Sequence, residues 1–383
     1  MQRFYFDHNA TTPVAPEVLE AMTACLGQVY GNASSIHHFG QAAKERMEAA
    51  RRQLAALMGC SAADIVFTSG GTESDNMAIL GAVRARGGAR HVVTSAIEHP
   101  AVLGPCQQLE REGVQVTRLR VGPSGVLDPA EVRRALRPDT ALVSIMHANN
   151  ELGTVQPIAE IAAIVRAAGV PLHVDGVQAL GKIPVDVTAL GVDLYSVSGH
   201  KLYAAKGVGA LYVRKGTTLA PIAFGGHHER DRRPGTENVP GIAAFGVAAE
   251  LAGRTLAAES TRLGALRDRL EEAILRRISG ATVNGSRASR TPNTSNVCFD
   301  GIDGEAMVIA LDLRGFAVST GAACSSGALA PSHVLTAIGL SPDRARASMR
   351  FSLGRGTTAD QVDALVDALE GAVGHLRRIS AHA

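Results

Sequence analysis

The sequence predicts an α/β protein built on a mostly parallel sheet of about seven strands that is covered by helices. Strand-like and helix-like patterns alternate through the N-terminal two thirds of the chain. The strand-like segments at residues 171–175 and 192–198 are almost continuous apolar runs, which indicates burial on both faces of a sheet. Glycine contributes 41 residues and aromatic residues only 4%, which suits tight turns and aliphatic packing.

The individual elements follow from local patterns. Residues 40–58 carry apolar side chains at helical spacing and stop at Gly59, a residue suited to end a helix. Short apolar runs bounded by turn residues predict strands at residues 64–68, 91–95, 140–147, 171–175, 192–198 and 208–213. Periodic segments between them predict helices at residues 72–83, from about 99, and at 158–168.

The C-terminal third changes character and predicts a second, smaller α+β domain. A long amphipathic helix is expected around residues 263–274, strands at 296–299 and 317–319, and a last helix at 359–376. We expect a large domain at residues 15–255. The small domain should combine residues 1–14 with 256–383 and carry a cysteine-bearing loop at about 319–331.

Composition excludes several classes of protein. The formal net charge is +2 with acids and bases interspersed, so no nucleic-acid or membrane surface is indicated. The five cysteines are odd in number and form no CxxC pair, which argues against a zinc site or a disulfide framework. The chain shows no signal-peptide run and no stretch of ~20 apolar residues. We therefore expect a soluble, cytoplasmic protein with reduced thiols and no metal.

A glycine-rich turn is the first candidate for chemistry. Residues 66–74 read VFTSGGTES, the pattern of a strand, a turn and a helix start. Gly71 and Thr72 would open the helix, where free backbone N–H groups and the helix dipole can hold a phosphate. The segment lacks the lysine of a P-loop and the GxGxxG spacing, so an ordinary glycine-rich turn is the alternative.

Charged side chains follow two neighbouring buried strands. Asp175 ends the strand at residues 171–175, where open α/β sheets bind ligands. A carboxylate there needs a cation, such as the pyridinium nitrogen of pyridoxal phosphate, unless it only caps the following residues. Lys201 follows the strand at residues 192–198, where a desolvated amine suits a Schiff base, unless its side chain reaches solvent.

A histidine and a cysteine complete the candidates. His99 also follows a strand; its imidazole could stack on a cofactor ring and move protons, or simply cap a helix. Cys324 lies in STGAACSSG, residues 319–327, a run of small residues that predicts an exposed, mobile loop in which a thiolate can form. The remaining cysteines lie in apolar or helical contexts and are expected to be small hydrophobes: Cys25, Cys60, Cys106 and Cys298.

Along nearly its whole length the chain resembles the cysteine desulfurases of the NifS/IscS type, class V aminotransferase-like enzymes with the fold-type I architecture. The stretches that carry the resemblance are FDHNATTP at residues 6–13, TSGGTESDN at 68–76, ANNE at 148–151, HVDGVQ at 173–178, SGHK at 198–201, GTEN at 235–238, GAACS at 321–325 and RFSL at 350–353. The chain departs from the family at Ala33 and at residues 204–205, where the family often has proline and Gly-Pro. Neither change alters an implied catalytic residue.

The resemblance implies roles around a pyridoxal 5'-phosphate cofactor. Lys201 would carry the cofactor as a Schiff base and then act as the base that removes the substrate α-proton. Asp175 would pair with the pyridinium nitrogen, and His99 would stack on the ring and manage protons. Gln178 and Asn150 would contact the phenolic oxygen.

The resemblance also implies the phosphate and substrate contacts. The phosphate would be held by Gly71, Thr72, Ser198 and His200. Thr236 matches a position that reaches the phosphate of the neighbouring subunit, which implies a homodimer. Arg350 would bind the substrate carboxylate through its fork, with help from Asn32.

The implied activity is the removal of sulfur from L-cysteine, which gives L-alanine and a persulfide on Cys324. That sulfur would pass to an acceptor or scaffold protein in iron–sulfur assembly, nitrogenase maturation, tRNA thiolation or DNA phosphorothioation, between which the sequence does not choose. A selenocysteine lyase, or another lyase or aminotransferase with the same cofactor, is the alternative. A non-enzymatic assembly partner is disfavoured because Lys201, Asp175 and Cys324 are all present.

Overall fold

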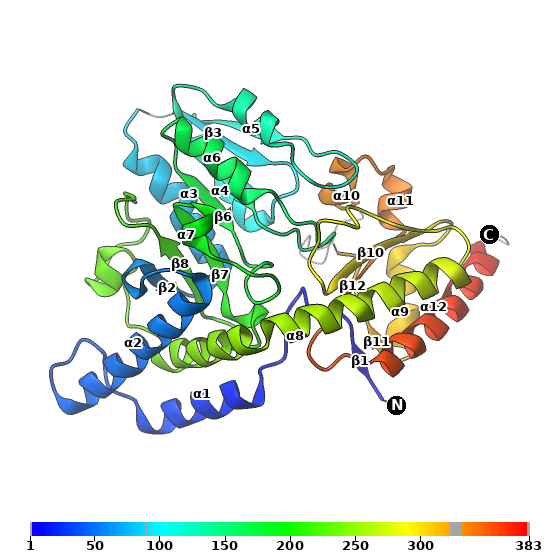
Figure 1. Cartoon of the computed structure of the whole chain (residues 1–383), viewed down its shortest axis with the longest axis horizontal. Coiled ribbons are helices and arrows are strands. Elements are labelled where there is room, and N and C mark those ends of the chain that lie inside the picture. Colours follow the sequence, from blue (N-terminus) through cyan, green and yellow to red (C-terminus); the bar gives the residue numbers. More distant parts are fainter. Residues whose placement is uncertain (1, 89, 322–330, 381–383) are drawn as a thin grey trace.

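A computed structural model describes residues 2–88, 90–321 and 331–380 of the chain (Figure 1). A seven-stranded sheet has the strand order β2–β8–β7–β6–β5–β3–β4. The strands are β2 (Ile65–Thr68), β3 (His91–Ser95), β4 (Gln115–Leu119), β5 (Thr140–Met146), β6 (Leu172–Asp175), β7 (Leu194–Ser198) and β8 (Gly209–Val213). Within this sheet β8 alone runs antiparallel to its neighbours. The predicted α/β class with a mostly parallel sheet is therefore confirmed.

Helices cover both faces of this sheet. They are α1 (Pro16–Gln28), α2 (His38–Met58), α3 (Gly71–Ala85), α4 (Pro100–Arg111), α5 (Pro129–Ala135), α6 (Ile158–Ala167) and α7 (Val187–Leu190). Alternate side chains of one strand enter different apolar clusters: Ile65 and Phe67 belong to the cluster that includes α2, whereas Val66 belongs to the cluster formed with α3 and α4. Burial on both faces explains why the strands read as apolar runs.

A second core forms around a small antiparallel sheet. Its strands are β9 (Ala281–Val283), β10 (Thr294–Phe299) and β12 (Ser348–Ser352), and β1 (Phe4–Tyr5) pairs in parallel with β11 (Phe316–Ala317) nearby. The helices of this core are α9 (Gly304–Asp312) and α12 (Ala359–Ser380), whereas α10 (His333–Ala337) and α11 (Pro342–Arg346) bury their apolar side chains in the first core. Phe6 is fully buried in the second core, which ties the N-terminus to it. The division of the chain into a large domain at residues 15–255 and a small domain stays a prediction.

Helix α8 (Val239–Arg277) joins the two cores and has 39 residues (Figure 1). Its first half packs on α1 and α2, and its second half carries the predicted apolar face onto α12. By length and composition alone α8 could cross a membrane, but 50% of that apolar stretch is buried inside the molecule. Contact with two cores accounts for the apolar character of α8.

Candidate active site

The parallel strands of the large sheet end at one edge, where a pocket of about 280 Å³ opens. Because β6 and β7 are neighbours, Asp175 at the end of β6 and Lys201 just after β7 line this same pocket. An antiparallel neighbour allows a short connection, and so the link from β7 to β8 keeps Lys201 at this edge. The residues named from the sequence that line the pocket are Gly71, Thr72, His99, Asn150, Asp175, Gln178, Ser198, His200, Lys201 and Arg350.

The N-terminal segment holds the Lys201 amine. Lys201 Nζ donates to the backbone oxygens of Asn9 at 2.5 Å and of Ala10 at 2.7 Å. The same segment is tied to the Lys201 loop, because Thr12 N donates to the carbonyl oxygen of His200 at 3.1 Å. The amine is thus fixed at the pocket wall, as covalent attachment of a carbonyl cofactor requires.

Asp175 is a buried carboxyl that would gain from a cation. Val177 N donates to Asp175 Oδ1 at 3.0 Å. Burial, helped by the neighbouring Asp75 and opposed by His99, raises the pKa of Asp175 to about 7. A cationic ring nitrogen bound beside Asp175 would restore its ionised form, which is the electrostatic demand of a pyridinium group.

The opening turn of α3 provides an anion site. No side chain caps α3 among the described residues, so its first backbone N–H groups remain available. Gly71 lets Val177 approach, because a Cβ at Gly71 would lie 2.8 Å from Val177 Cγ2. Ser198 and His200 line the same pocket as this helix start. These groups fit a phosphate.

His200 is neutral at ordinary pH. Burial, together with the charges of Lys201 and Lys206, lowers the pKa of His200 to about 4. Its Nδ1 lies 3.1 Å from Thr11 Oγ1. The imidazole therefore contributes a neutral hydrogen-bonding group to the pocket.

His99 is held as the N-cap of α4. Its Nδ1 accepts a hydrogen bond from Ala101 N at 3.1 Å, so the neutral ring carries its proton on Nε2. Burial lowers the pKa of His99, whereas Asp175 acts in the opposite direction. His99 therefore does both things that the sequence offered as alternatives. Its Nδ1 caps α4, and its ring lines the pocket.

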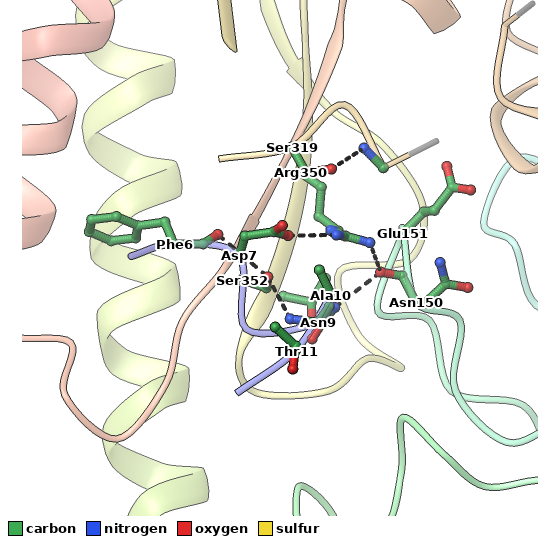
Figure 2. A network of polar contacts seen from close by, with 12 residues as sticks. Phe6, Asp7, Asn9, Ala10, Thr11, Asn150, Glu151, Ser319, Arg350 and Ser352 are labelled. Carbon is green, nitrogen blue, oxygen red and sulfur yellow. Dashed lines mark hydrogen bonds and ion pairs between the residues drawn. The ribbon is translucent and has the colours of Figure 1, made fainter. Parts of the chain in front are cut away.

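Arg350 projects from β12 into the pocket and is 2% exposed (Figure 2). Its Nη2 lies 2.6 Å from Asp7 Oδ1, and its Nη1 donates to the carbonyl oxygen of Asn150 at 3.0 Å. Its Nε is buried without a hydrogen-bond partner among the described residues. An unsatisfied guanidinium N–H in a pocket is the feature expected of a site that takes an anionic ligand.

Two residues of the site have no role in the sequence interpretation. Asn9 contacts Lys201, Gln178, Lys182, Asn150 and the small domain, although its stretch was noted only as a family match. Lys182 lies four residues after Gln178 and donates to its side-chain oxygen. The spacing of Lys182 from Gln178 is the one sequence signal that could have indicated this contact.

Three candidates lie elsewhere. Asn32 is exposed in the loop between α1 and α2, where its Oδ1 accepts from Ser34 N at 2.9 Å; it does not reach Arg350 within one chain. Thr236 is exposed and outside the pocket of its own chain. Cys324 lies outside the described residues, and Gly321, the last described residue before it, lines the pocket.

Comparison with known sequences gives one family and close relatives. The class V aminotransferase family model matches residues 4–365. A cysteine desulfurase of Gluconacetobacter diazotrophicus is 49% identical over 99% of this chain and 96% of its own length. The cysteine desulfurase IscS of an Anaeromyxobacter species is 52% identical over 98% of this chain and 94% of its own length.

Comparison with solved structures agrees. A NifS-like protein superposes with a TM-score of 0.92 at 36% identity and covers 98% of this chain and 100% of its own. A structure of SspA in complex with cysteine gives a TM-score of 0.82 at 38% identity, over 91% of this chain and 98% of its own. These similarities extend across both cores.

Proposed function

The chain belongs to the class V aminotransferase family, and from this premise we infer that it is a cysteine desulfurase that uses pyridoxal 5'-phosphate. One observation carries the inference: a fixed lysine amine, a buried carboxyl and an uncapped helix start line a single pocket. An aldehyde, a ring nitrogen and a phosphate are the three groups that such an arrangement would bind.

The residues of the pocket would each bind a different part of the cofactor. Lys201 would hold the cofactor, Asp175 would pair with its ring nitrogen, and the start of α3 with Ser198 and His200 would hold its phosphate. When bound, this cofactor supplies an electron sink for the carbon that loses its proton. Lys201 Nζ is the group placed to take that proton, and His99 Nε2 can donate or receive a second one.

L-cysteine is the substrate that fits these groups. Arg350 would bind its carboxylate through the guanidinium edge that carries the unsatisfied Nε. The bond between the substrate β-carbon and sulfur breaks as a sulfur–sulfur bond forms with the Cys324 thiolate. The carbon fragment takes up protons and leaves as L-alanine, and the sulfur remains as a persulfide for an acceptor or scaffold protein.

We further propose that the enzyme is a homodimer. Several large apolar side chains are exposed in the described part of the chain, among them Ile36 at 94%, Phe224 at 86% and Tyr30 at 72%. Tyr30, on the loop that precedes α2, stacks on Phe39 in the first turn of α2, with ring centroids 5.3 Å apart. Thr236, exposed and outside its own pocket, would reach the phosphate in the partner subunit. Sedimentation of the holoenzyme should give twice the chain mass, and a monomer would contradict this assembly.

We also propose a cytoplasmic location. The four cysteines within the described residues, Cys25, Cys60, Cys106 and Cys298, are free thiols. Burial raises the pKa of Cys60 and of Cys106 to about 12, so these thiols are inert. A reducing compartment suits an enzyme that must keep Cys324 available. Fractionation of cells that express the chain tests this location.

The activity is tested with L-cysteine and the purified holoenzyme. Alanine should form, and sulfide should be released when a reductant is added. The Cys324→Ala variant should retain the cofactor and release little sulfide, because no thiol accepts the sulfur. A Cys324→Ala variant that released sulfide as fast as the parent would contradict the persulfide route.

A further inference from the structure

A second lysine lies directly behind the cofactor pocket. Lys182 does not line that pocket; it lines a smaller cavity of about 40 Å³ on the other side of Lys201, whose side chain borders both. The Lys182 amine contacts two side-chain amide oxygens of the pocket wall. It donates to Oε1 of Gln178 and, at 2.8 Å, to Oδ1 of Asn9.

These contacts give the Gln178 amide one orientation. Gln178 Nε2 donates to the carbonyl oxygen of Asn9 at 3.0 Å, and a carbonyl oxygen can only accept. Rotating the amide by half a turn would place Oε1 against that carbonyl oxygen and the NH₂ group against the Lys182 amine. Asn9 is fixed in the same way, because its Nδ2 donates to the carbonyl oxygen of Asn150 at 3.1 Å.

The fixed amide lies beside the reactive amine. The carbonyl oxygen of Asn9 accepts from Gln178 Nε2 and also from Lys201 Nζ, at 2.5 Å. The two donors therefore converge on one oxygen atom. In pyridoxal phosphate the phenolic oxygen is adjacent to the carbon that joins the lysine nitrogen, so a donor that lies beside Lys201 Nζ is placed to reach it.

We infer that Lys182 is a positioning residue: its hydrogen bond to Gln178 Oε1 turns Gln178 Nε2 toward the phenolic oxygen of the cofactor on Lys201. The inference deepens the proposed function and rests on it. Burial and the charges of Lys201 and Arg350 lower the pKa of Lys182 well below its usual value. A neutral amine still has two N–H donors, which are enough for both amide oxygens.

The consequence is electronic as well as geometric. A hydrogen bond donated to the phenolic oxygen favours the form of the bound chromophore that has lost its proton. Loss of Lys182 should weaken that bond, and so the apparent pKa of the visible absorption band of the holoenzyme should rise. A net hydrogen-bond contribution corresponds to a rise of about one pKa unit.

The test is a pH titration of that absorption band in four proteins: the parent, Lys182→Met, Gln178→Leu and the double variant. Lys182→Met should raise the pKa by about one unit, and Gln178→Leu by at least as much because the donor itself is removed. In the Gln178→Leu background, Lys182→Met should add no further shift. Lys182→Gln, which keeps an N–H donor, should restore a value close to that of the parent.

A matched control separates position from charge. Lys206→Met removes an exposed positive charge near the same site and should leave the titration unchanged. The other titratable groups that face the pocket stay in place in all these variants: Asp75, His99, Asp175, His200, Lys201 and Arg350. The charges of Lys182 and Lys206 both act on His200, so Lys206→Met also reports any effect that passes through His200.

The outcomes are distinct. An equal shift from Lys182→Met in both backgrounds, or no shift from Gln178→Leu alone, would overturn the positioning role. If the chain binds the cofactor and makes alanine, but the pKa of its absorption band is the same with and without Lys182, the positioning role is wrong and the proposed function stands. A chain that binds no cofactor at Lys201 would overturn both.

Discussion

Replacing Arg350 with lysine tests how the site distinguishes an amino acid from other amines. Lysine keeps the positive charge but loses the planar fork that contacts Asp7 Oδ1 at 2.6 Å and the carbonyl oxygen of Asn150 at 3.0 Å (Figure 2). The guanidinium group also carries the buried Nε, which has no hydrogen-bond partner among the described residues. Arg350→Lys therefore removes both the alignment of the cation and the second donor to a carboxylate.

The magnitude follows from burial. Arg350 is 2% exposed, and disrupting a buried, hydrogen-bonded ion pair costs about 3 kcal/mol at the lower end of the usual range. At about 1.4 kcal/mol per factor of ten, kcat/KM for L-cysteine should fall about a hundredfold. The absorption spectrum of the bound cofactor should be unchanged, because Arg350 is expected to contact the substrate.

Steady-state alanine formation over a range of L-cysteine concentrations measures this loss. Arg346→Lys, an exposed position just before β12, is the matched control and should behave as the parent does. A kcat/KM within about threefold of the parent would refute carboxylate binding by Arg350, since such a ratio corresponds to less than 1 kcal/mol.

Three other substitutions probe the buried charges. Asp175→Asn cannot pair ionically with a ring cation, so cofactor affinity measured by equilibrium dialysis should fall at least about tenfold. Burial raises the pKa of Glu98 to about 8, and between roughly pH 4.5 and 8 the folded state holds a proton that the unfolded state has lost. Thermal melts should therefore show the parent losing stability relative to Glu98→Gln as pH rises through that window; parallel curves would contradict this. Arg51 donates to both carboxylate oxygens of buried Glu229, so Arg51→Met should cost about 3–5 kcal/mol in urea unfolding, whereas exposed Arg52→Met should cost little.

Most of the large sheet could be predicted because its strands are buried on both faces and stand out as apolar runs. The edge strand β4 (Gln115–Leu119) was missed because its side chains are largely exposed or half-buried and include Arg118. The long helix α8 was predicted only in its second half, where leucines repeat on one face. Its first half contacts α1 and α2, and small residues such as Ala244 and Ala248 produce no comparable periodic signal.

Two residues of the site could be predicted from one rule of sheet topology. Asp175 and Lys201 share a pocket because side chains that follow adjacent parallel strands meet at one edge of a sheet. Asn9 was not predictable, because its contacts depend on how the N-terminal segment crosses from the second core to Lys201. Lys182 was missed because a lysine in a turn normally reaches solvent, and only the folded wall shows that its amine turns inward.

The proposed function depends above all on Lys201 as the residue that holds the cofactor. Borohydride reduction of the holoenzyme, followed by proteolysis and mass spectrometry, measures this directly. We predict one reduced cofactor per chain on the peptide that contains Lys201, and none on Lys182 or Lys206. A reduced cofactor on another lysine, or a protein that takes up no cofactor at all, would contradict it.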